Sequence, residues 1–140
     1  MIKYPAKYIY DKGIFSLRFI DFPTSIVRGI NMREMQENAK LSLSTNIRHR
    51  LDNNLEIPFP SSYRDDFTIM IEPDNEIEIP LIIKLLRIST GQSQRQVADI
   101  IEVPYHNYQQ LEQVDGFNPT FEVLKKVAST FNKELYIEFR

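Results

Sequence analysis

The stretch GQSQRQVADIIEVPYHNYQQLE, residues 91–112, predicts two short helices with a break between them. Ser93 is a suitable N-cap for the first helix, because its hydroxyl can accept a hydrogen bond from a free backbone N–H. Pro104 suits the start of the second helix, where its missing N–H costs nothing. Two helices joined by a tight turn are one way in which proteins enter the major groove of DNA. The stretch therefore raises the question of whether this chain binds DNA.

The apolar residues of this stretch are placed for close packing of the two helices. Ala98 is small enough for the inner face of the first helix, and Ile101 and Val103 can bury the turn. Tyr108 and Leu111 are three positions apart, so both face inward from the second helix. A plain helical bundle with polar outer faces would have the same periodicity, and this pattern alone does not separate the two interpretations.

The side chains left facing outward from the second helix are polar. Asparagine and glutamine amides match the donor and acceptor pattern of adenine. The start of the first helix offers backbone N–H groups and a positive dipole end to a phosphate, and Arg95 adds a charge there. The residues that we expect to contact DNA are Ser93, Gln94, Arg95, Pro104, Tyr105, His106, Asn107, Gln109 and Gln110.

The rest of residues 79–140 predicts two more helices and a final strand. One helix opens at Pro80, in PLIIKLLRIST, and another lies in PTFEVLKKVASTF. The second of these has an apolar face made of Phe121, Leu124, Val127, Ala128 and Phe131. The closing ELYIEFR alternates as a strand does, and it could pair with its copy in a second chain or with residues near 78–80.

The spaced residues of the quoted stretch resemble the Cro/repressor-type (XRE) helix-turn-helix family over residues 81–131. The matching positions are Gln94, Ala98, Ile101, Val103, Tyr108, Leu111 and Glu112. Two features depart from that pattern: residues 113–115 intervene before Gly116, and the last element is a predicted strand instead of a helix.

The charge of residues 79–140 bears on how such a module would bind DNA. Seven basic and seven acidic residues leave it neutral, and the whole chain has a net charge of −2. A neutral module gains little affinity from phosphates and would bind one half-site weakly. We therefore expect a homodimer or higher oligomer, formed through the C-terminal region, that places two copies about 34 Å apart on DNA.

Residues 1–64 predict a small sheet with one covering helix. KYPAKYIY and IFSLRFIDF alternate as strands around Asp11-Lys12-Gly13, which suits a tight hairpin turn, and SIVRGI can form a third strand. An apolar stripe then recurs every three or four residues and predicts a helix capped by Asn31; it comprises Met32, Met35, Ala39, Leu43, Ile47 and Leu51. FTIMIEP can return as a fourth strand. The expected fold is α+β: a β-β-β-α-β sheet followed by an all-α bundle that ends in a strand.

Residues 65–78 form an acidic joint between the two blocks. They contain Asp65, Asp66, Glu72, Asp74, Glu76 and Glu78, with no lysine or arginine. One interpretation is a solvated strand edge and linker, and the other is a negative surface that faces a basic partner. The expected division is therefore 1–64, 65–78 and 79–140.

The motifs of the first block resemble the HicB antitoxin family. They are Tyr4-Pro5, Asp21-Phe22-Pro23, Gly29 before the helix, Glu37 and Ala39 within it, and then Ile57-Pro58 and Pro60-Ser61. They follow one another in family order across residues 4–62, and the C-terminal module matches the longer members. The pattern differs where Thr24-Ser25 follow the second motif and where Asn38 separates Glu37 from Ala39.

This resemblance implies a degraded ribonuclease H-like head that neutralises a HicA-type mRNA ribonuclease, together with repression of the operon through the DNA-binding module. We expect the toxin contacts at Asp21, Phe22, Pro23, Asp65, Asp66, Glu72 and Asp74. The alternative is a stand-alone helix-turn-helix regulator whose N-terminal block senses a ligand.

The composition predicts no catalysis, metal or cofactor. No set of carboxylates has the spacing of a magnesium site, and the two histidines, His49 and His106, belong to different blocks. The 140 residues contain no cysteine, no apolar run long enough to span a membrane and no secretory leader, so we expect a cytoplasmic protein without a membrane partner.

Overall fold

A β-hairpin opens the structure, a computed structural model that describes all 140 residues. Its strands are β1 (Tyr4–Asp11) and β2 (Ile14–Phe19). Lys12 and Gly13 join them with φ of +49° and +82°, the left-handed conformation that a two-residue turn needs to match the twist of its strands. The hairpin predicted at Asp11-Lys12-Gly13 is therefore confirmed.

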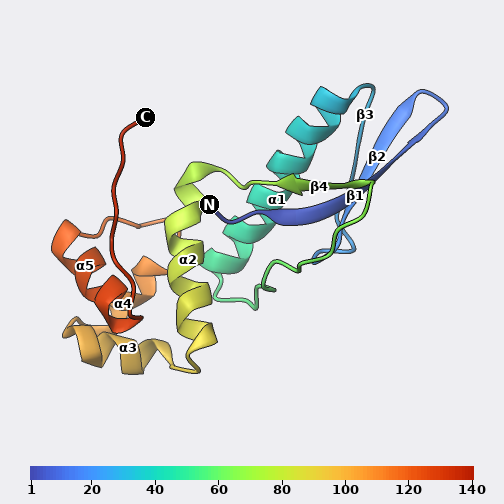
Figure 1. Cartoon of the computed structure of the whole chain (residues 1–140). Helices are drawn as coiled ribbons and strands as arrows, with labels where there is room; N and C mark the ends of the chain where they lie inside the picture. The colour runs from blue at the N-terminus through green and yellow to red at the C-terminus, as the bar shows by residue number, and fades with distance from the viewer.

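Two further strands extend the hairpin into a four-stranded antiparallel sheet. They are β3 (Ile26–Gly29) and β4 (Thr68–Ile71), and the strand order is β3-β2-β1-β4. The register places Ala6 opposite Phe19 and also opposite Ile69 of β4, so apolar side chains line one face of the sheet. Helix α1 (Met32–Asp52) follows this sheet along its length in Figure 1.

Helix α1 covers the apolar face with the predicted stripe. Asn31 caps it by accepting the Glu34 N–H at 2.8 Å. The stripe is buried from Met35 to Leu51, and only Met32, in the first turn, remains partly exposed. Gly29 allows β3 to approach closely, because a Cβ at this position would lie 2.8 Å from Met35 Cα. We call the sheet and α1 the head.

Helix α2 (Asn75–Ser89) begins earlier than predicted, so Pro80 lies inside the helix and not in its first turn. The cost of the interior proline is one missing backbone hydrogen bond. The offsetting gain is burial, since Ile77, Leu81 and Leu85 complete the 15-residue core of the head. The acidic joint is therefore β4 and the start of α2, and the predicted boundary at residues 78/79 falls within a helix.

Three short helices build a second core beside α2. They are α3 (Gln94–Ile101), α4 (Tyr105–Leu111) and α5 (Phe121–Thr130), and we call them the helical unit. The predicted inward residues of α3 and α4 are buried, together with Ile83 of α2. Phe121 differs from its prediction: it is 56% exposed because it is the first residue of α5 and projects beyond the core.

The predicted C-terminal strand is not confirmed within the chain. Residues 134–140 form no regular element, and they leave α5 as an unpaired segment (Figure 1). Pairing with residues near 78–80 is excluded because those residues are helical, so their backbone groups serve α2. Tyr136 and Phe139 are 81% and 96% exposed. No helix of the structure is long and apolar enough to cross a bilayer.

Candidate nucleic-acid and protein interfaces

The turn between α3 and α4 is short and tightly bonded. Glu102 takes φ of +58°, and the Val103 N–H donates to the Ala98 carbonyl at 3.1 Å. At the other end of α3, Ser93 and Gln96 form a capping box, in which each side chain accepts the other's backbone N–H. Both ends of α3 are thus anchored locally, which sets its direction relative to α4.

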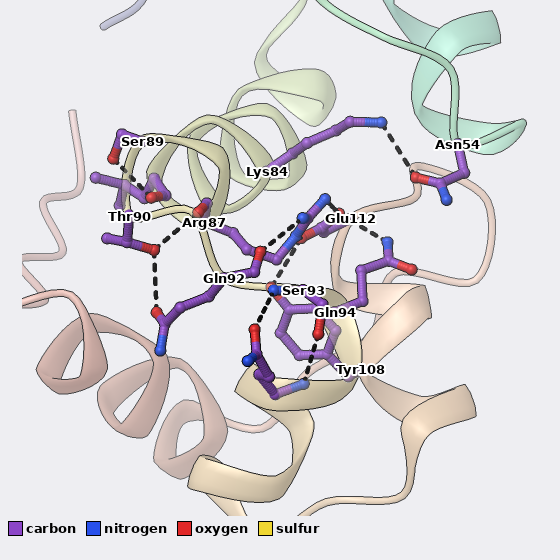
Figure 2. Close-up of polar contacts among 12 residues, drawn as sticks. Asn54, Lys84, Arg87, Ser89, Thr90, Gln92, Ser93, Gln94, Tyr108 and Glu112 are labelled. Atoms are coloured by element: carbon purple, nitrogen blue, oxygen red, sulfur yellow. Dashed lines mark hydrogen bonds and ion pairs between the residues drawn. The ribbon is translucent and has the colours of Figure 1, made fainter.

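A buried ionic network centred on Glu112 joins α2, α3 and α4 (Figure 2). Arg87 Nε and Nη2 donate to the two carboxylate oxygens of Glu112 at 2.5 and 3.0 Å. The Gln94 amide and the Tyr108 hydroxyl each donate to the same carboxylate at 2.8 Å. Arg87 also donates to the Gln92 carbonyl at 3.0 Å. The carboxylate is therefore fully satisfied, as a charge with almost no exposure requires.

The network shifts the pKa values of its members. Burial lowers the pKa of the Arg87 guanidinium, but its hydrogen bonds and charge interaction with Glu112 outweigh burial, so the net shift is upward. Burial raises the pKa of the Tyr108 hydroxyl, and the adjacent Glu112 carboxylate raises it further. Both groups therefore keep their protons at neutral pH.

Four of the side chains predicted to face outward from α4 are available at the surface. His106 and Asn107 are exposed, and Gln109 and Gln110 are partly exposed. Tyr105 is partly buried because the Arg95 guanidinium lies over its ring, 4.4 Å from the centroid. Pro104 is exposed and precedes α4, as predicted. The α3–α4 pair therefore presents a polar surface with one cation at its edge.

Gln94 does not face outward with the rest of this set. It is 9% exposed; its amide donates to Glu112, and its oxygen accepts the Tyr105 hydroxyl at 3.5 Å. Its backbone N–H is the first of α3, and an α-helix leaves its first N–H groups without an intrahelical partner. Sequence reasoning missed Arg87 and did not foresee the role of Glu112. The available signal was Glu112 itself, an acid four positions after the inward Tyr108.

The structure disperses the residues expected to contact a toxin. Phe22 is buried and packs on Tyr4, with ring centroids 5.2 Å apart. Asp21 accepts the Ser61 N–H at 3.0 Å and so fixes a loop, whereas Pro23 is exposed. Phe22 therefore supports this loop from beneath, and Pro23 is the member of the motif that solvent reaches.

The acidic joint is largely neutralised by cations from other elements. Lys7 pairs with Asp65 at 2.8 Å, Lys3 with Glu72 at 2.8 Å, and Lys40 with Asp74 at 3.8 Å. Arg48 pairs with Glu76. A hydrogen bond and charge attraction from Lys3 lower the pKa of Glu72, and hydrogen bonds from Lys7 and Thr68 lower the pKa of Asp65. Asp66 is exposed and has no such partner, so the negative surface that was one of the two interpretations of this segment is reduced.

Sequence reasoning also missed the exposed apolar side chains around the end of the β1–β2 hairpin. Ile9, Tyr10 and Ile14 are exposed there, and Tyr10 packs against Phe15 in a tilted arrangement with ring centroids 4.6 Å apart. Exposed apolar residues that gather in one place are typical of interaction surfaces. No group of three or more histidine, aspartate or glutamate residues is placed to bind a metal ion.

These features define an α+β protein in which a sheet-and-helix head is joined through α2 to a helical unit with a polar outer surface. Residues 3–80 match the family model described as the HicB-like antitoxin of bacterial toxin-antitoxin systems. The match spans more than half of the chain, so the chain belongs to this HicB-like antitoxin family.

Comparison with solved structures finds the crystal structure of the Burkholderia pseudomallei antitoxin HicB. The TM-score is 0.47 and the sequence identity 11%, with 66% of this chain and 87% of that chain covered. Comparison with curated protein sequences finds no match.

Proposed function

We propose that this antitoxin neutralises a HicA-type mRNA ribonuclease through its head and represses its own operon through the α3–α4 pair, acting as a helix-turn-helix of the Cro/repressor type. Family membership implies a toxin partner. The observation that carries the DNA-binding part is the outer surface of α4, where His106 and Asn107 are exposed and Gln109 and Gln110 partly so, while the opposite side is locked by Glu112.

In the proposed DNA complex, α4 enters the major groove and the start of α3 meets the backbone. Asn107 and Gln110 read base edges, since their amides can donate and accept together. Ser93, Arg95 and the free N–H groups at the start of α3 contact a phosphate. Because residues 79–140 carry equal numbers of acidic and basic residues, a dimer is needed to reach useful affinity.

In the proposed toxin complex, the head blocks the toxin by binding to it. The architecture of the head is a reduced form of the ribonuclease H-like fold. The order β-β-β-α-β supports this interpretation. The contacts proposed from the sequence lie in the loop at Asp21–Pro23 and along the acidic joint. Since most of those acids have cations beside them, charge attraction contributes less than their number suggests, and Asp66 is the acid best placed to add to it.

The test is to replace Asn107 or Gln110 by alanine and to measure binding to DNA from upstream of the gene. Each lost pair of base contacts should cost about 1–3 kcal/mol, or about five- to 150-fold in affinity. Gln36→Ala, which removes an exposed amide from α1, should leave DNA binding unchanged and serves as the matched control.

Binding of the toxin by the same full-length variants separates the two roles. Both should bind the product of the adjacent gene as the unmodified chain does. If neither substitution changes DNA affinity, α4 is not the reading helix. If no adjacent gene encodes a small basic protein that co-purifies with the chain, a stand-alone regulator with a ligand-sensing head is the better interpretation.

A further inference from the structure

The segment that departs from the helix-turn-helix pattern, residues 113–115, docks on the end of α1. Asp52 Oδ1 accepts the backbone N–H of Val114 at 2.8 Å and that of Asp115 at 3.2 Å. The Val114 side chain is partly buried against the core of the head. The Arg48 guanidinium, one turn earlier on α1, lies 3.5 Å from the Asp115 carboxylate. The extra residues thus connect the helical unit to the head.

The position of Asp52 indicates that its contact with residues 113–115 has a functional role. It is the last residue of α1, where the negative end of the helix dipole disfavours a carboxylate. His49 and Arg50 in the same turn are the favourable kind of residue for this end. The two N–H groups of the 113–115 segment offset that cost, and no other hydrogen-bond partner of the Asp52 side chain is found.

A second contact joins the same end of α1 to α2. Lys84 Nζ donates to the Leu55 carbonyl at 2.7 Å and to Asn54 Oδ1 at 3.3 Å. Lys84 forms hydrogen bonds with the residues just after α1, whereas Asp52 forms them with the segment that follows α4. The position of α4 is therefore set from two sides: by Glu112 within the helical unit and by Asp52 from the head.

We propose that Asp52 is a positioning residue for DNA recognition: from the head, it holds the segment after α4 so that α4 is presented correctly to the groove. This inference rests on the proposed DNA-binding function.

Two substitutions of Asp52 in the full-length chain separate positioning from charge. Asp52→Ala and Asp52→Asn remove the same negative charge, but the asparagine oxygen can still accept both N–H groups. We expect Asp52→Ala to bind upstream DNA about five- to tenfold more weakly, and Asp52→Asn to bind at least as well as the unmodified chain. Glu56→Ala, which removes an exposed acid just after α1, should not weaken binding and is the matched control.

If charge alone mattered, both Asp52 variants would bind DNA more tightly and to the same extent, and that result would overturn the proposal. Amide hydrogen exchange and the NMR resonances of α4 give a readout without DNA. Asp52→Ala should speed exchange at Val114 and Asp115 and shift α4 resonances, whereas Asp52→Asn should not. If Asp52→Ala does not fold, Asp52→Ser, with a single shorter acceptor, takes its place.

The two readouts also separate failure of this inference from failure of the proposed function. If the unmodified chain binds no upstream DNA, but Asp52→Ala still changes exchange and the α4 resonances, the positioning contact stands and the proposed DNA-binding function is refuted. A chain that binds DNA but whose α4 resonances are the same in Asp52→Ala and the unmodified protein refutes the positioning role alone.

Discussion

Two buried tyrosines show how single residues join the parts of this molecule. The Tyr108 hydroxyl donates to Glu112 at 2.8 Å, and the Tyr4 hydroxyl donates to the Pro58 carbonyl at 2.9 Å. Burial raises the pKa of each hydroxyl, with a further upward contribution from the charge of Glu112 on Tyr108 and of Asp21 on Tyr4. A tyrosine whose pKa is higher in the folded state favours folding only while it keeps its proton.

The resulting prediction concerns stability in alkali. Below the ordinary tyrosine pKa of 10.0 both states hold the proton and the stabilisation is complete; above it, the unfolded state releases the proton first, so stability falls as pH rises. Urea unfolding at about pH 8 and about pH 11 should show this loss, and Tyr4→Phe or Tyr108→Phe should each reduce it. Tyr136→Phe is the control, because Tyr136 is exposed. If stability depends on pH equally in the unmodified chain and in the three variants, the loss of stability in alkali cannot be assigned to Tyr4 and Tyr108.

At the scale of elements, the C-terminal segment is the least satisfied part of the chain. Residues 134–140 alternate in polarity and expose Tyr136, Ile137 and Phe139, and no strand of the same chain pairs with them. An unpaired extended segment with apolar side chains can pair with its copy in a second chain. This is the route by which we expect the homodimer to form.

Deletion of residues 134–140 should therefore convert a dimer into a monomer without unfolding the chain, because no residue of this segment belongs to either core. Light scattering after size-exclusion chromatography gives the mass, and circular dichroism checks the fold. Replacing Lys133 by alanine, just before the segment, should leave the dimer intact. A full-length chain that is already monomeric, or a truncated chain that still dimerises, would refute this route.

At the scale of the whole molecule, α2 belongs to both cores. Leu81 and Leu85 are buried in the head, while Ile83, on the other side of the same helix, is buried in the helical unit. A helix shared in this way makes the two units difficult to separate. A fragment cut at the predicted boundary, residues 1–78, lacks two leucines from the core of the head.

We predict that residues 1–89 unfold cooperatively in urea, whereas residues 1–78 are much less stable. Loss of one buried leucine side chain typically costs about 2–5 kcal/mol, and the shorter fragment loses two. Within residues 1–89, Leu81→Ala should destabilise the head and Ile83→Ala should not, which makes them a matched pair. Equal stability of the two fragments would show that α2 contributes little to the head.

Local patterns in the sequence were sufficient for most of the elements. The hairpin at Lys12-Gly13 depends on residues next to one another, and the stripe of α1 on a repeat every three or four residues, so both were predicted before any tertiary contact was known. The inward positions of Ala98, Tyr108 and Leu111 followed from the same periodicity.

Contacts between residues that are far apart in the sequence decided the features that local patterns did not predict. The start of α2 depends on burial of Ile77 and Leu81 in a core made by residues far earlier in the chain. Lys3, Lys7 and Lys40 neutralise acids that look isolated in the sequence, and Glu112 turns Gln94 inward from 18 positions away. By itself, therefore, the sequence determined most of the strands and helices and which of their sides are apolar. Only the tertiary structure decided which charges remain free, because a charge is neutralised by whatever folding brings within a few ångströms of it.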